Sequence, residues 1–292
     1  MRSQTFFPRG GLPGNSDIGI IMWNHYGSSV TSDTAGDAAA AANHLRRPVT
    51  AINRPGSGLT SPYQSRKLTR GYERVVQQDV LSVVERLSVL GLRRFVLAGR
   101  SAGGAAALIA ANAPGLPVVA VHAQEPVGWD WQEPAAAEHD YNAYRSRQKE
   151  LLAAPDNTLI SPLPTEKTGW DKLHRMGQNI VHGLIDRSNN QDVFRQPLAC
   201  MAAYNIARNL PGVQLDMHFA EYSLALGTED PQELQMGLRV SRMQAARSGG
   251  HAVVAPINAV AVPNTVHSSF DLRTFSIGLL EQTVRAAETM PL

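Results

Sequence analysis

The sequence predicts an α/β protein built on one mostly parallel sheet that helices cover on both faces. Short apolar runs alternate with segments of helical spacing up to about residue 127 and again after about residue 198. Strands that are apolar throughout are typical of a sheet buried on both faces, and strand–helix–strand alternation is typical of parallel pairing. The chain of 292 residues, 43% of them hydrophobic and 18% charged, is long enough to bury a large core.

Strands and helices alternate along the first part of the chain. The expected strands lie within residues 17–24, 48–54, 93–99 and 116–124. The expected helices cover residues 33–45, 71–90 and 102–113. In the second helix apolar residues recur at helical spacing and Gly91 ends the pattern, which is the usual signal of a helix terminus.

The alternation breaks between residues 128 and 198, which read as helices and loops. We interpret this stretch as a helical cap inserted into a core formed by residues 1–127 and 199–292. Trp129 and Trp131 fall in the cap, where they either line an apolar substrate pocket or form the core of the cap itself.

The core resumes after the cap. Strands are expected within residues 213–227 and 257–263, and helices from about residue 231 and about residue 270.

Composition excludes several classes of partner. Lys and Arg total 27 against 25 Asp and Glu, a formal charge of +2 that nominates no nucleic-acid partner. No apolar run is long enough for a signal peptide or a membrane span, so the expected compartment is the cytoplasm and no membrane partner is expected. The single cysteine, Cys200, excludes an internal disulfide. A homodimer is compatible with these features.

The most informative motif is "GRSAGG", residues 99–104, which contains the pattern G-x-S-x-G. It directly follows an expected strand and opens an expected helix, and that context predicts a sharp turn that exposes the hydroxyl of Ser101 as a nucleophile. The turn crowds the positions two residues to either side, which Gly99 and Gly103 occupy. The backbone N–H of Ala102, at the start of the helix, is a candidate donor to an oxyanion. An inert serine in a tight turn is the competing interpretation.

With these flanks the chain resembles the α/β-hydrolase fold family over nearly its whole length. "FVLAGRSAGGAAALIA" resembles the nucleophile elbow of the family, "LALGTEDP" its acid-bearing turn and "AVPNTVHSSF" its histidine loop. "IIMWNHYGSS" resembles the loop that provides the second oxyanion donor. That loop reads His25-Tyr26-Gly27 where the family usually has His-Gly, so the resemblance leaves Tyr26 and Gly27 as alternatives for the donor. His25 is a candidate substrate-binding residue or a loop histidine bonded to the backbone.

For the general base, position along the chain favours His267. Most of the other histidines lie on expected helices or within expected strands, and His251 precedes the last strand rather than following it. His267 comes just after that strand, and the carboxyl ends of parallel strands share one edge of the sheet, where Ser101 is also expected.

The acid that orients the base has three candidates. Asp230 in "GTEDP" matches the acid-bearing turn of the family best. Glu221 is favoured if the preceding strand ends at "HFAE", and Glu125 if the acid follows the strand before it. Any carboxylate placed beside the imidazole can hold its tautomer and stabilise the imidazolium.

The resemblance implies acyl transfer to water through an acyl-serine intermediate. The expected substrate is a small to medium, partly apolar ester, lactone or thioester. The same fold also supports acyltransferases, cofactor-free lyases or cyclases, and ligand-binding proteins without catalysis. No metal and no cofactor are expected, because the histidines form no close pair at ligand spacing and "PGSG" lacks the Lys and Ser/Thr of a phosphate loop.

Overall fold

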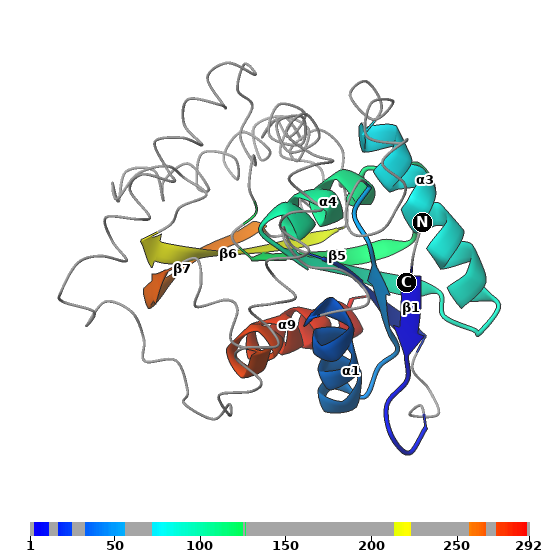
Figure 1. Ribbon diagram of the computed structural model, residues 1–292, viewed down its shortest axis with the longest axis horizontal. Helices are drawn as coiled ribbons and strands as arrows, with labels where there is room; N and C mark the ends of the chain where they lie inside the picture. The colour runs from blue at the N-terminus through cyan, green and yellow to red at the C-terminus, as the bar shows by residue number, and fades with distance from the viewer. Residues whose placement is uncertain are drawn as a thin grey trace.

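The structure is a computed structural model, and it describes residues 3–11, 17–24, 33–55, 72–124, 126, 213–222, 257–266 and 273–290. These residues form a seven-stranded sheet with the order β1-β3-β2-β4-β5-β6-β7 (Figure 1). The strands are β1 Ser3–Phe6, β2 Ile18–Trp23, β3 Val49–Ile52, β4 Arg94–Arg100, β5 Val118–Gln124, β6 Gln214–Tyr222 and β7 Ile257–Val266. The helices are α1 Asp33–Leu45, α3 Tyr72–Ser88, α4 Ala102–Ala111 and α9 Arg273–Glu288.

All strand pairs from β3 to β7 are parallel, and β1 pairs antiparallel with β3. The carboxyl ends of six strands therefore lie along one edge of the sheet. The register fixes the neighbours at this edge: Gly99 pairs with Trp23, and Gln124 pairs with Arg100 on one side and His218 on the other. Any chemistry carried by the loops at this edge draws on groups from several strands at once.

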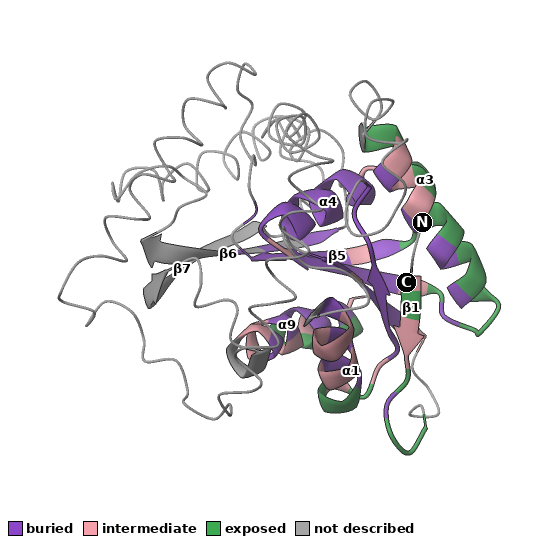
Figure 2. Cartoon of the chain, in the orientation of Figure 1, coloured by how far each residue is buried: buried purple, intermediate pink, exposed green. Residues whose placement is uncertain are grey.

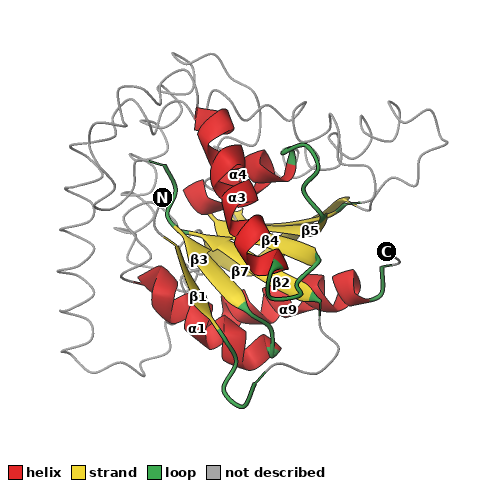
Figure 3. Ribbon diagram, turned by 90° about the vertical axis from the view of Figure 1, so that its right-hand side faces the viewer, coloured by secondary structure: helices red, strands yellow, loops and turns green. Residues whose placement is uncertain are grey.

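Helices cover the sheet on both faces (Figures 1 and 3): α3 and α4 on one, α1 and α9 on the other. Side chains of β4 alternate between the two layers, so that Phe95 and Leu97 belong to the core on the α3/α4 side and Val96 and Ala98 to the core on the α1/α9 side. All of α4 is buried (Figure 2). Its mostly small side chains let the helix lie close against the sheet.

The parallel α/β architecture that the sequence predicts is confirmed, and the expected strands and helices of the described segments are present. The four-residue edge strand β1 was not anticipated, because its sequence "SQTF" has neither an apolar run nor a regular alternation. The boundaries of the expected cap, residues 128–198, and the helix expected from about residue 231 lie outside the described residues. No helix in the described part of the chain is long and apolar enough to cross a bilayer.

Candidate functional site

Ser101 occupies the sharp turn between β4 and α4, as the motif predicts, but the residue is buried, at 8% exposure, rather than exposed. It lies at the N-cap of α4 with φ 52° and ψ −124°, a left-handed conformation that L-residues other than glycine rarely adopt. Such a residue carries about 1–3 kcal/mol of strain and persists only where its surroundings fix it. Two backbone hydrogen bonds do so here: Ser101 N–H donates to Gln124 O at 2.8 Å, and Ala105 N–H donates to Ser101 O at 3.1 Å.

The glycines of the motif are required by backbone contacts at this turn. A Cβ on Gly99 would lie 2.2 Å from the carbonyl oxygen of Gly103, and a Cβ on Gly103 would lie 2.7 Å from Trp23 O and 2.8 Å from Asn24 O. Real Cβ atoms do not approach backbone so closely. At Gly104 the contact is softer, with Gly99 O and Pro126 Cβ each 3.2 Å away. The small residues therefore allow α4 to begin directly against the ends of β2 and β4.

The hydroxyl of Ser101 does not cap the helix, although serine at an N-cap usually does so. A serine retained for its local structural role would accept a hydrogen bond from the first turn of α4. The first N–H groups of a helix have no partner within it, and they point toward the N-terminus with the positive end of the helix dipole. Ala102 is the first residue of α4, so its N–H is one of these groups beside Ser101.

A buried contact fixes the start of the loop that follows β2. Asn24 is fully buried, and its side-chain carbonyl accepts a hydrogen bond from Arg54 N–H at 2.6 Å. Its backbone carbonyl accepts from Arg54 Nε at 2.9 Å and also lies against Gly103. Asn24 thus joins the ends of β2 and β3 to the first turn of α4, one residue before the expected oxyanion loop.

Most of the other predicted site residues lie outside the described part of the chain. These are His25, Tyr26, Gly27, Glu125, Trp129, Trp131, Asp230 and His267. The backbone of Glu221 is described: it is the next-to-last residue of β6, at the carboxyl edge of the sheet. Val266, the residue before His267, ends β7 at the same edge and pairs with Tyr222.

Sequence reasoning missed a buried polar cluster beneath this edge, on the α9 side of the sheet. We call it the β5–α9 cluster, and it consists of His122, Gln124, Ser276 and Thr283. Gln124 Nε2 donates to Ser276 O at 3.0 Å and contacts His122 Nε2 at 2.8 Å, while Ser276 Oγ donates to Gln124 Oε1 at 2.5 Å. His122 Nδ1 lies 2.8 Å from Thr283 Oγ1. The signal in the sequence was "VAVHAQ", where polar residues interrupt an otherwise apolar strand at alternate positions.

These contacts assign the tautomer of His122. An amide nitrogen cannot accept a hydrogen bond, so His122 Nε2 must be the acceptor from Gln124 Nε2. His122 Nδ1 therefore carries the proton and donates to Thr283 Oγ1. Protonation of Nε2 would remove the acceptor and break the contact with Gln124.

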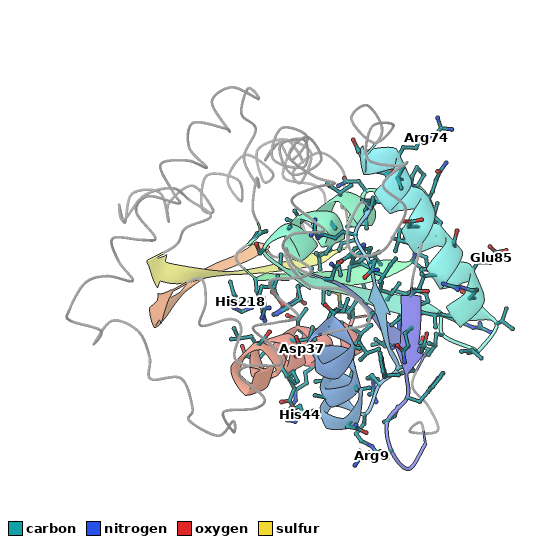
Figure 4. All side chains as sticks on the ribbon, viewed as in Figure 1. Arg9, Asp37, His44, Arg74, Glu85 and His218 are labelled. Atoms are coloured by element: carbon teal, nitrogen blue, oxygen red, sulfur yellow. The ribbon has the colours of Figure 1, made fainter. Side chains whose placement is uncertain are left out.

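A second buried histidine, His218, lies beside His122, with ring centroids 4.9 Å apart (Figure 4 labels His218). Neither ring nitrogen of His218 has a hydrogen-bond partner among the described residues. Burial lowers the pKa of His122 well below its ordinary value, and the neighbouring His218 adds to this effect. Burial also lowers the pKa of His218, against a raising effect of Asp216. Both rings are therefore neutral at pH 7.

A small cavity of about 40 Å³ lies next to the cluster, under the carboxyl ends of β2 and β4. Its polar lining comes from Thr34, Asp37, Arg100, His122, Gln124 and Ser276. Among the residues that the structure describes, no group of three or more His, Cys, Asp or Glu could hold a metal ion.

The contact geometry predicts that Gly103→Ala destabilises the protein. The added methyl group would overlap the backbone of Trp23 and Asn24, which cannot move without disturbing β2, and overpacking of this kind costs about 1–3 kcal/mol. Gly278→Ala is the matched control, because Gly278 lies inside α9 with no atom within 4 Å of the added group. Urea denaturation should show a lower free energy of unfolding for Gly103→Ala and one higher by about 0.5–1 kcal/mol for Gly278→Ala. Equal stabilities would contradict the close approach of α4 to β2.

The buried histidines predict a loss of stability in mild acid. A histidine whose pKa is lower in the folded than in the unfolded chain binds fewer protons when folded. The free energy of unfolding therefore has its full value above the unfolded pKa of about 6.5 and decreases as the pH falls toward the folded pKa. Between pH 7 and 5 the free energy of unfolding should fall with a slope of up to about 1.4 kcal/mol per pH unit for each such histidine. His122→Gln should show a shallower slope in urea titrations, and an unchanged slope would contradict the neutral, buried state of His122.

No protein-family model matches this chain, and no curated protein sequence does. Several solved structures do match. Proline iminopeptidase from Mycobacterium smegmatis matches with a TM-score of 0.56 and 15% identity over 98% of this chain and 95% of that one. The enol-lactonase from Burkholderia xenovorans LB400 matches with a TM-score of 0.55 and 16% identity over 99% and 96%. MGS-M2, an α/β hydrolase enzyme from a deep-sea metagenome library, matches with a TM-score of 0.52 and 14% identity over 97% and 94%. At these identities the likeness concerns the fold, and it agrees with the strand order and with the turn at Ser101: this chain has the α/β-hydrolase fold.

Proposed function

We propose that this protein is a serine hydrolase that cleaves a carboxylic ester, lactone or thioester through an acyl-serine intermediate. The observation that carries the proposal is the conformation of Ser101 and the absence of a capping hydrogen bond from its side chain. Its backbone is held in a strained conformation at the carboxyl edge of the sheet, and its hydroxyl is not used to cap α4. Strain of this kind is concentrated at functional sites, and a hydroxyl presented in this way can attack a carbonyl group.

In the proposed reaction Ser101 Oγ attacks the substrate carbonyl carbon while His267 takes the hydroxyl proton. The resulting oxyanion accepts a hydrogen bond from Ala102 N–H and a second from the loop after Asn24, at Tyr26 or Gly27. Collapse expels the alcohol or thiol, which receives the proton from His267. Water then attacks the acyl-serine with His267 as base, releases the acid and restores the serine.

The path of the chain supports His267 as the base. β7 ends at Val266, three strands from β4, or about 14 Å at the usual strand spacing. The next described element, α9, packs against β5 and β4, and its first turns reach Gln124 through Ser276. The described residues on either side of His267 therefore lie at the end of β7 and at the start of a helix that reaches β5, the strand whose end binds Ser101.

The acid of the proposed triad is Asp230, with Glu221 and Glu125 as alternatives. Glu221 belongs to β6. In the sheet, β6 lies between β4, which precedes Ser101, and β7, which precedes His267. The role of Glu221 would be to accept a hydrogen bond from His267 Nδ1–H and so keep Nε2 directed at Ser101.

For the substrate we propose a small to medium molecule with an apolar part. The enol-lactonase among the similar structures supports an ester-type bond. His25, Trp129 and Trp131 are the proposed contacts for the substrate, and we propose that the cap of residues 128–198 covers it.

The proposal predicts that a fluorophosphonate probe labels the wild-type protein on Ser101 and that the protein hydrolyses p-nitrophenyl esters of short to medium acids. Ser101→Ala should abolish labelling and lower kcat at least about 10³-fold, because the nucleophile is lost. Mass spectrometry of the labelled peptide and a chromogenic assay provide the two measurements.

Ser88→Ala is the control, because Ser88 is an exposed serine at the end of α3. It should leave both measurements unchanged. Labelling at another residue, or full ester hydrolysis by Ser101→Ala, would contradict the proposal. Labelling of Ser101 without turnover of any ester would instead indicate transfer of the acyl group to an acceptor other than water.

A further inference from the structure

Gln124 contacts both the nucleophile turn and α9. Its backbone carbonyl, at the end of β5, accepts the N–H of Ser101 at 2.8 Å. Its side-chain amide, which is buried, donates to Ser276 O at 3.0 Å and accepts from Ser276 Oγ at 2.5 Å. The amide of Gln124 therefore binds α9 through both the backbone carbonyl and the hydroxyl of Ser276.

The position of α9 matters because the helix follows directly on the connection that carries His267. β7 ends at Val266 and α9 is described from Arg273 onward, so one end of this connection is set by the sheet and the other by the helix. Ser276 lies in the first turn of α9, at the carboxyl edge of the sheet. A shift of α9 along or away from β5 would move Arg273, the described end of this connection.

The rest of the β5–α9 cluster makes the attachment rigid. The second N–H of the Gln124 amide points at His122 Nε2, and His122 in turn donates to Thr283 Oγ1, two turns further along α9. Every polar atom of the Gln124 side chain is thus bonded, and Thr283 and His122 are almost fully buried. Fully bonded buried networks have one geometry, because any rearrangement leaves a buried polar group without a partner.

We propose that Gln124 is a positioning residue that sets the distance between Ser101 and His267, by binding the nucleophile turn through its backbone and α9 through its side chain. The inference rests on the proposed function. In this role Gln124 does not contact the substrate. Its side chain acts through α9 on the base, while its carbonyl acts on the nucleophile.

The test is Gln124→Met, which removes the amide but retains the backbone carbonyl and approximate volume. Gln214→Met is the matched control: Gln214 is a buried glutamine on the neighbouring strand β6, on the same face, and its amide donates to Asp216. For each variant we would measure kcat and KM with a p-nitrophenyl ester, the rate of fluorophosphonate labelling, and the melting temperature.

The expected result is a loss of catalytic rate in Gln124→Met but not in Gln214→Met. Gln124→Met should lower kcat and the labelling rate by about 10- to 100-fold, with KM within about twofold of wild type, because misplacement of a base affects the transition state more than substrate binding. Gln214→Met should lower the melting temperature while kcat stays within about threefold of wild type. Ser276→Ala should cause a smaller loss than Gln124→Met. The double variant should be no worse than Gln124→Met alone, because both substitutions remove the same contact.

Wild-type kcat and labelling in Gln124→Met would overturn the inference, and so would an equal loss in Gln214→Met. If Gln124→Met does not fold, Ser276→Ala and Thr283→Val carry the test, and wild-type kcat in both would overturn it. Failure of the proposed function gives a different pattern, in which the wild type itself is neither labelled nor active. An active wild type that is insensitive to Gln124→Met contradicts only the positioning role.

Discussion

The arrangement of the site depends on a backbone contact between β4 and α4, where Gly99 and Gly103 approach each other without side chains between them. This contact lets the chain reverse from strand to helix within one residue, and that residue is Ser101. The same close approach places the start of α4 against the carbonyls at the end of β2. Ser101, the first N–H of α4 and the end of β2 are thus positioned by one steric constraint.

Two buried polar contacts secure the elements around this turn, one on each side of it. The Asn24–Arg54 contact ties the ends of β2 and β3 together beside α4. The β5–α9 cluster ties the end of β5 to the helix that follows the histidine connection. Hydrogen bonds of this kind add little net stability but are costly to break once they are buried. They are therefore suited to hold a site in one geometry on an otherwise apolar sheet.

The sequence was sufficient to predict the fold and the sharp turn at Ser101, because both depend on local patterns. Apolar runs alternating with helical spacing indicate a parallel sheet, and Gly99, Ser101 and Gly103 after a strand indicate the turn. The Gln124 contacts could not be predicted, since they join residues more than 150 positions apart in the chain. Polar residues inside a strand indicate only that some partner exists. The choice among Asp230, Glu221 and Glu125 depends on three-dimensional proximity to His267, which spacing along the chain does not determine.

The most direct test of this account is a crystal structure of the protein after reaction with a fluorophosphonate. The account predicts a phosphonyl group on Ser101 Oγ whose oxygen accepts a hydrogen bond from Ala102 N–H at about 2.7–3.1 Å. It also predicts that the imidazole of His267 faces Ser101 Oγ, with one carboxylate hydrogen-bonded to its far nitrogen. A phosphonyl oxygen directed away from Ala102, or a different residue in the place of His267, would contradict it.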